Sequence, residues 1–185
     1  MSDVLVVGGG AAGLSAGLFT AKNDLDTTVF DTDGTWLHKA HLFNYLGIRS
    51  IDGSVFHERA RKHASDDHGA ELHDDEEVES VTKTEDGRFH VVTGEGEYES
   101  DYLVLATGAN RDLAEELGAD FDGDVVDVGV DMETSVENAY ATGAMVRDQE
   151  WQAVISAGDG AAAALDILSK EEGEHFHDFD TPANV

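Results

Sequence analysis

The sequence contains no cysteine in its 185 residues. The chain therefore forms no disulfide, carries no thiol chemistry and cannot hold an iron–sulfur cluster with its own residues. Long apolar runs are also missing, since no stretch approaches the length of a membrane-spanning helix. An apolar strand is expected from Val4 onward, which leaves no room for a signal peptide. We therefore expect a cytoplasmic protein that does not enter a membrane.

The sequence is also poor in basic residues. It has 11 Lys and Arg against 40 Asp and Glu, which gives a formal net charge of −29. The acidic residues are spread along the whole chain, and a hydrophobic fraction of 41% argues against disorder. Such a charge repels nucleic acid and anionic membranes. We expect one folded domain with the acidic coat of a halophilic protein, whose self-repulsion high salt would screen.

A glycine-rich turn follows the first expected strand. Residues 4–7 form an apolar, mostly β-branched run, which is typical of a strand buried on both faces of a parallel sheet. Gly8, Gly10 and Gly13 then stand in G-x-G-x-x-G register, which suits a tight turn, a close diphosphate and close helix–strand packing. A helix is expected over residues 11–22, with its N-terminal N–H groups and dipole facing the phosphates.

An acidic residue stands where a dinucleotide site needs one. Residues 27–30 predict a second short strand, and Asp31 ends it, 18 positions after Gly13. A carboxylate there can accept hydrogen bonds from a ribose diol. The strand, turn, helix and acidic residue together predict dinucleotide binding, and the alternative is a structural turn that binds nothing.

The connection over residues 33–53 mixes aromatic and polar side chains. It forms either the wall of a ligand pocket or a loop that covers its own small cluster. His38 and His41 are spaced i, i+3 and could share a metal. The sequence places no third ligand beside them, so no metal site is expected.

The rest of the chain alternates strands and helices. We expect a helix over residues 54–68, capped by Ser54, on which His57, His63 and His68 are solvated. Glu76, Glu77 and Glu79 are expected to be exposed. A short parallel strand is expected at 70–72, followed by an antiparallel β-meander with strands at 78–84, 88–93 and 97–100. An apolar strand at 102–106, a polar linker at 111–124 and strands at 125–130 and 139–142 come next. The last helix is expected at 152–170, and its many alanine and glycine residues suit close packing.

Several motifs in this order resemble one family. The fingerprint and Asp31 are followed by Phe-Asn-Tyr-Leu-Gly at 43–47, Ala-Thr-Gly at 106–108, Glu-Thr-Ser-Val-Glu-Asn-Ala-Tyr-Ala-Thr-Gly-Ala at 133–144 and Trp-Gln-Ala-Val at 151–154. The chain resembles the FAD-binding domain of the low-molecular-weight thioredoxin reductases, within the pyridine nucleotide–disulfide oxidoreductases. This resemblance implies an α/β fold: a single Rossmann-like domain over residues 1–185, with a parallel sheet, flanking helices and an antiparallel β-meander.

The resemblance also implies the cofactor and its contacts. FAD would be bound, with its ADP half on the first glycines and Asp31, and its ring beside the loop that carries Asn44 and the start of the last helix. The residues implied as cofactor-binding are Gly8, Gly10, Ala11, Ala12, Gly13, Asp31, Asn44, Thr107, Gly108, Gly143, Gln152 and Ala153.

The chain departs from the family at four points. The family inserts an NADPH-binding domain after the Ala-Thr-Gly strand, and the interval here, about thirty residues, is too short for one. The Cys-x-x-Cys motif of that domain is absent, so the chain is not a self-contained thioredoxin reductase. Ala144 replaces the aspartate of the family's Gly-Asp pair, which would remove a hydrogen bond of about 1.5–3 kcal/mol. Trp151 replaces an arginine.

Two classes of function remain open. The first is a minimal flavoprotein oxidoreductase that receives electrons from free NAD(P)H or a partner protein. Its weak candidates for an acid or base are His38 and His41, which lie in the loop beside the implied ring. The second is a non-catalytic FAD- or nucleotide-binding sensor or assembly subunit. NAD in the glycine-rich site is a third and weaker hypothesis. The family also implies a homodimer, with Trp36 or Trp151 near the shielded region.

Overall fold

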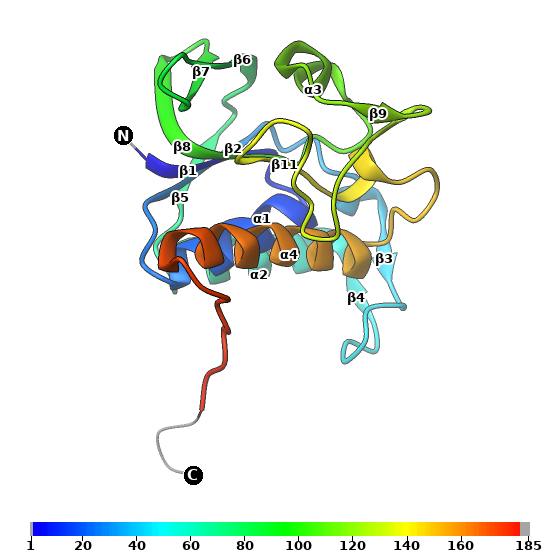
Figure 1. The fold of residues 1–185 in the computed structure, drawn as a ribbon. Helices are drawn as coiled ribbons and strands as arrows, with labels where there is room; N and C mark the ends of the chain where they lie inside the picture. Colours follow the sequence, from blue (N-terminus) through cyan, green and yellow to red (C-terminus); the bar gives the residue numbers. More distant parts are fainter. Residues whose placement is uncertain (1, 182–185) are drawn as a thin grey trace.

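The fold is built on a mixed sheet of seven strands, seen in a computed structural model that describes residues 2–181. Five parallel strands, in the order β5-β2-β1-β8-β11, form its core, and β7 and β6 continue it as an antiparallel meander (Figure 1). The strands of this sheet are β1 (Ser2–Val7), β2 (Thr27–Asp31), β5 (Glu71–Asp74), β6 (Val78–Lys83), β7 (Phe89–Thr93), β8 (Glu97–Leu105) and β11 (Ala139–Ala141). The α/β fold expected from the sequence, with its parallel core and meander, is confirmed.

Helices and two small ribbons complete the described part of the chain. The helices are α1 (Ala11–Lys22), α2 (Gly53–Ser65), α3 (Asp112–Leu117) and α4 (Ala153–Glu172), with 3-10 turns η1 (Trp36–Lys39) and η2 (Gly143–Val146). The ribbons pair β3 (His41–Leu42) with β4 (Ile51–Asp52) and β9 (Phe121–Asp122) with β10 (Val125–Val126). None of the helices in the described residues is long and apolar enough to cross a membrane.

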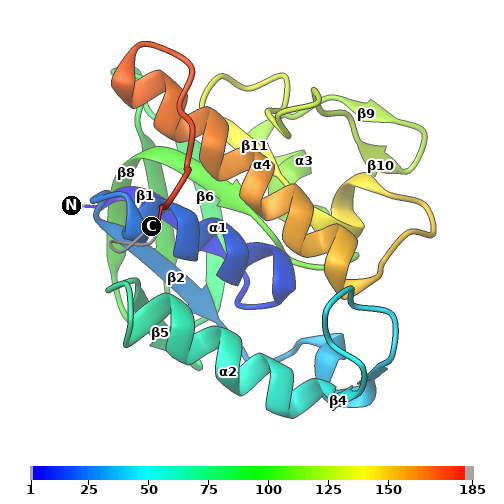
Figure 2. The same ribbon diagram turned by 90° about the horizontal axis from the view of Figure 1, so that it is seen from below.

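The sheet separates two apolar layers. Helices α1, α2 and α4 lie side by side on one face, and α3 and the meander lie toward the other (Figures 1 and 2). Side chains alternate along β1, so Val4 and Val6 pack in the core beneath α1 and α4, while Leu5 and Val7 pack with the meander. Both faces of β1 are therefore buried, as its continuous apolar sequence predicts.

Strand β8 joins the two halves of the sheet, and here the sequence-based expectation was wrong. Residues 97–100 and 102–106 were expected as separate strands, but Glu97–Leu105 is one strand of nine residues. Its first half pairs antiparallel with β7, and its second half pairs parallel with β1. Asp101 lies between the two expected strands, but it does not form a turn. Its exposed side chain continues the alternation of buried and exposed residues, so the strand runs on through it.

Helix α4 crosses α1 at very close range. A Cβ atom on Gly160 would lie 2.0 Å from the carbonyl oxygen of Ala12. The side chains at this crossing are small and buried, including Ala16 and Ala163. The close packing expected of the last helix is therefore confirmed. Position 160 requires glycine, because the backbone of α1 leaves no room for a side chain.

Local expectations around α2 need correction. The helix is capped by Asp52, whose carboxylate accepts a hydrogen bond of 2.9 Å from the N–H of Ser54, and not by Ser54 itself. His57 was expected to be solvated, but it lies on the inner face of α2 and is 2% exposed. The charged residues next to His57 in the sequence lie on the other faces of the helix and point outward. They therefore do not predict whether His57 itself is exposed.

Three further segments differ from the sequence-based expectation. Glu76 was expected to be exposed but is buried and hydrogen-bonded to Thr93 and Tyr98. The segment 111–124, expected as a polar linker, contains α3 and β9, because Leu113 and Leu117 pack against the core one helical turn apart. The strand expected at 125–130 is reduced to Val125–Val126.

Candidate dinucleotide site

In the glycine turn between β1 and α1, two of the glycines pack directly against backbone atoms. Gly8 has a φ of +113°, and a Cβ atom there would lie 2.3 Å from the carbonyl oxygen of Ala106. A Cβ atom on Gly13 would lie 1.8 Å from the carbonyl oxygen of Gly8. Both positions therefore require glycine for packing, whether or not a ligand is bound.

Gly10 is different, because a Cβ atom placed there would meet no backbone atom within 4 Å. The nearest atom to a Cβ placed there is Oγ1 of Thr35 at 3.4 Å. Gly10 is also the N-cap of α1, and among the described residues no side chain caps this helix. The first helical hydrogen bond joins the N–H of Leu14 to Gly10, so the amides of Ala11, Ala12 and Gly13 precede the helical ladder. This arrangement fits a phosphate group.

Asp31 lies at the end of β2 next to this turn, and it already has partners. Its side chain is about 5% exposed. One carboxylate oxygen accepts a hydrogen bond of 2.9 Å from the N–H of Asp33, and the other accepts one of 2.6 Å from Arg61 on α2. Arg61 also pairs with Asp74 at the end of β5. A ribose diol would need Arg61 to move before it could use the second oxygen.

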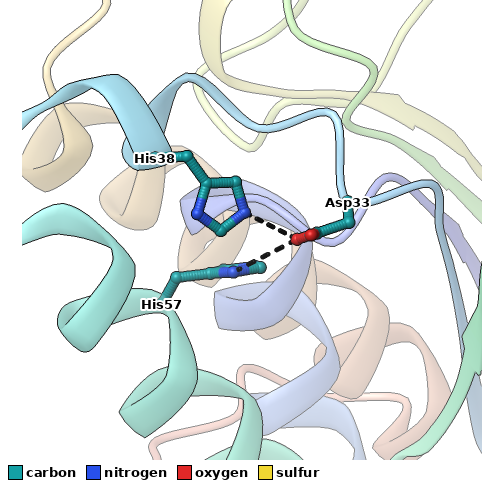
Figure 3. Close-up of side chains that lie close together, drawn as sticks. All are labelled: Asp33, His38 and His57. Carbon is teal, nitrogen blue, oxygen red and sulfur yellow. Dashed lines mark hydrogen bonds and ion pairs between the residues drawn. The ribbon is translucent and has the colours of Figure 1, made fainter.

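A cluster of Asp33, His38 and His57 lies beside Gly9 of the turn (Figure 3). Nε2 of His38 donates to Oδ1 of Asp33 at 2.6 Å, and Nδ1 of His38 is 2.9 Å from Oγ of Ser54. Nε2 of His57 donates to the carbonyl oxygen of Gly9 at 2.7 Å. The hydrogen bond from His38 holds the pKa of the Asp33 carboxyl below its usual value.

His41 does not share this cluster. Its Nε2 lies 2.9 Å from Oγ of Ser50 across the β3–β4 ribbon, and its ring packs on Phe43. Among the described residues, the structure therefore pairs His38 with Asp33 and His57, and not with His41 as the i, i+3 spacing suggested.

The Ala-Thr-Gly segment after β8 and η2 lie against the same turn. A Cβ atom on Gly143, whose φ is +68°, would lie 3.3 Å from Cβ of Ala12. Thr107 donates a hydrogen bond of 2.6 Å to the carbonyl oxygen of Asn110, and Gly108 is exposed with a φ of +69°. Arg111 donates to the carbonyl oxygens of Ala144 and Met145. The structure thus gathers the expected residues at 107, 108 and 143 near the start of α1.

The start of α4 lies beside the loop after β2. Gln152 is the exposed N-cap of α4, and Ala153 is its first residue. The rings of Trp36 and Trp151 are 5.2 Å apart, and both are about half exposed. Asn44 is exposed on the β3–β4 connection. The tryptophan pair joins two regions that the resemblance places near the flavin ring.

Sequence reasoning missed Asp33, His57 and Arg61 as site residues. A signal was present, because His57 and Arg61 stand i, i+4 on α2 and therefore share one helical face. That face points at the end of β2, which supplies Asp31 and, two residues later, Asp33. Locating this face required the docking of α2, which the local sequence does not specify.

The sequence matches the family model described as pyridine nucleotide-disulphide oxidoreductase, over residues 2–109 and 48–161. It is 31% identical over 173 residues to a thioredoxin reductase of Listeria monocytogenes, covering 91% of this chain and 50% of that protein. It is 38% identical over 113 residues to a thioredoxin reductase of Treponema pallidum, covering 59% of this chain and 36% of that protein. The chain thus spans half or less of the length of these relatives.

Solved structures show the same fold. A thioredoxin reductase from Gloeobacter violaceus superposes with a TM-score of 0.86 at 20% identity, covering 97% of this chain and 99% of that chain. An atypical thioredoxin reductase from Desulfovibrio vulgaris Hildenborough gives a TM-score of 0.86 at 18% identity, covering 94% of this chain and 99% of that chain. The expected family is confirmed: the chain belongs to the pyridine nucleotide-disulphide oxidoreductases, a family of typically FAD-binding oxidoreductases, and is thioredoxin reductase-like.

Proposed function

We propose that this chain is a FAD-binding flavoprotein domain of an oxidoreductase. The turn at Gly10 carries this proposal, because a Cβ atom there would make only a side-chain contact of 3.4 Å with Thr35, whereas the backbone leaves no room for one at Gly8 and Gly13. The unbonded amides at the start of α1 would hold the diphosphate, and Asp31 would take the ribose once Arg61 moves aside. The bound flavin would supply hydride and electron transfer, while the protein supplies position and electrostatics.

The electrons would come from free NAD(P)H or from a partner protein. The chain has no cysteine, so it would not pass electrons to a thiol pair of its own. The second candidate function is a non-catalytic FAD- or nucleotide-binding subunit. The lack of cysteine favours it, because a bound flavin would have no thiol pair in this chain to receive its electrons.

The experiment that tests FAD binding is the absorption spectrum of the purified protein, with the released cofactor identified by mass. Gly10→Val places a branched side chain where the diphosphate would approach, and the fold should persist because the φ of −80° and ψ of −167° at Gly10 suit a β-branched residue. Gly94→Val, in the turn between β7 and β8, is the matched control, since a Cβ there first meets Glu79 at 3.7 Å.

We expect yellow protein containing FAD from the wild type and from Gly94→Val. From Gly10→Val we expect colourless protein that still unfolds cooperatively, with a melting temperature lowered only by the loss of a glycine N-cap. Full flavin occupancy in Gly10→Val would contradict the placement of the diphosphate. Wild-type protein that neither contains nor takes up FAD would contradict the function itself.

We further propose a homodimer with Trp36 or Trp151 near the shielded region. Their exposed, adjacent rings form an apolar surface that a second copy could cover. Light scattering across the micromolar range checks this proposal. A monomer at every concentration would refute it.

A further inference from the structure

We propose that Asp33, His38 and His57 form a binding site for a divalent transition metal such as Zn²⁺. Oδ1 of Asp33 lies 2.6 Å from Nε2 of His38 and 3.8 Å from Nδ1 of His57. The three side chains each offer a ligand atom, and these atoms all lie within 4.8 Å of one another. Two imidazoles and one carboxylate are a typical ligand set for such metals. The inference does not rest on the proposed FAD binding, although the cluster adjoins the same turn through Gly9.

The tautomer of His57 supports the proposal. Its Nε2 lies 2.7 Å from the carbonyl oxygen of Gly9, which can only accept a hydrogen bond. The proton of neutral His57 is therefore on Nε2, and the lone pair is on Nδ1. That lone pair faces Oδ1 of Asp33 at 3.8 Å, a distance too long for a hydrogen bond. Two electron-rich atoms that face each other in this way would be stabilised by a cation between them, either a metal ion or a proton.

The distances suit a metal. Four-coordinate zinc with bonds of about 2.0–2.1 Å separates its ligand atoms by roughly 3.3 Å. The pair of His38 and Asp33 is closer than this at 2.6 Å, and the pair of His57 and Asp33 is wider at 3.8 Å. Shifts below about 1 Å bring both pairs to the required separation. The exposed side chains of Asp33 and His38 can make these shifts, while the buried His57 stays fixed.

The outer hydrogen bonds also match those of metal-bound histidines, which usually place the second ring nitrogen on an oxygen acceptor. Nε2 of His57 donates to Gly9, and Nδ1 of His38 lies 2.9 Å from Oγ of Ser54. A hydroxyl can donate or accept, so Ser54 permits His38 to move its proton to Nδ1 and bind metal through Nε2. Three protein ligands leave a fourth position for water.

Zinc binding by the full chain, freed of metal with a chelator, tests the proposal by isothermal titration calorimetry. Excess Mg²⁺ in the buffer occupies weak sites made only of carboxylates, of which this acidic protein offers many. His38→Gln removes a ligand, and Asp33→Asn removes another while keeping a residue that tolerates the φ of +53° at this position. His57 is left unchanged, because its bond to Gly9 belongs to the fold.

His41→Gln is the matched control. His41 is an exposed histidine of the same loop, and it too lies 2.9 Å from a serine hydroxyl, that of Ser50. We expect one zinc ion per wild-type chain, unchanged binding in His41→Gln, and at least about tenfold weaker binding in His38→Gln and Asp33→Asn, since even outer-sphere losses cost 10–100-fold.

Two results would overturn the site. One is zinc binding by His38→Gln and Asp33→Asn that equals the wild type. The other is no zinc binding by the wild type, which ¹⁵N chemical shifts of the imidazoles would explain if they show Nδ1 of His57 protonated. In that case a proton, and not a metal, would be the cation that the cluster holds.

Discussion

Replacing Glu76 with glutamine should lower the free energy of unfolding by roughly 2 kcal/mol at pH 8. The Glu76 carboxylate accepts hydrogen bonds of 2.6 Å from Thr93, 2.8 Å from Tyr98 and 2.7 Å from Nδ1 of His73. These bonds tie the end of β5 to β7 and β8. A glutamine oxygen can keep the bonds from Thr93 and Tyr98, and His73 can change tautomer to accept from the new amide.

The loss is therefore the charge assistance of three bonds and not the bonds themselves. A bond to a charged group contributes about 1.5–3 kcal/mol, against about 0.5–1.5 kcal/mol for a neutral one, so three bonds lose roughly 3 kcal/mol. Relief from burying a charge offsets part of this loss. A net loss of roughly 2 kcal/mol corresponds to a fall in Tm of about 4–8 °C for a chain of this size.

The effect should depend on pH in one direction. Burial raises the pKa of Glu76, but the hydrogen bonds from Thr93, Tyr98 and His73 outweigh burial and leave the pKa below its usual value. A lowered folded pKa gives stability that is complete above the unfolded value, about 4.3, and is lost as the pH falls through the folded value. The advantage of glutamate over glutamine should therefore be constant from pH 8 to about 5.5 and shrink below that.

Thermal unfolding followed by circular dichroism at pH 8, 5.5 and 4 measures this difference. Glu77→Gln, at the exposed neighbouring position, is the control and should change stability little at any of these pH values. Equal stability of Glu76→Gln and the wild type at pH 8 would refute the reasoning, and so would a difference that stays the same at pH 4.

Three other predictions follow from charge and from the site. With a net charge of −29, the protein should melt at a higher temperature in molar KCl than in dilute buffer, and an unchanged Tm would reject the proposed halophilic adaptation. Ala144→Asp should tighten FAD binding about tenfold or more in a fluorescence titration, because it restores a charge-assisted hydrogen bond, and no gain would mean that the cofactor is already satisfied there. Free NADH or NADPH should reduce bound flavin slowly in anaerobic stopped-flow absorbance, because about thirty residues after β8 hold no nicotinamide domain, whereas fast saturable reduction would reveal a nicotinamide site in this chain.

The first three elements of the fold could be predicted because their signals are local. The apolar run before Gly8, the glycine register and the strand ending at Asp31 each specify structure within a few residues, and β1, α1 and β2 follow them closely. The helix over Asp112–Leu117 was missed although Leu113 and Leu117 carry its signal. The composition of residues 111–124, with its glycines and acidic residues, indicated a polar linker, and two leucines were too few to indicate a helix.

The partners of the site residues could not be predicted in the same way. Arg61 reaches Asp31 from thirty positions away, and the contact depends on how α2 docks on the sheet. His57 stands among charged residues in the sequence, yet the inner face of α2 buries it. Periodicity predicts that a helix has a buried face, but when a polar residue lies on that face the sequence does not say which oxygen will satisfy it.

The crossing of α1 and α4 has a consequence for how this protein is made. Residues 23–152 separate the two helices in the sequence, yet the helices lie side by side (Figure 2). The backbone of Ala12 packs against Gly160. On the ribosome, α1 emerges early and keeps an uncovered apolar flank until α4 has been synthesised, since contacts of high sequence separation form late. A nascent chain stalled before residue 153 would therefore present the glycine turn on an incompletely covered helix, as a substrate for chaperones.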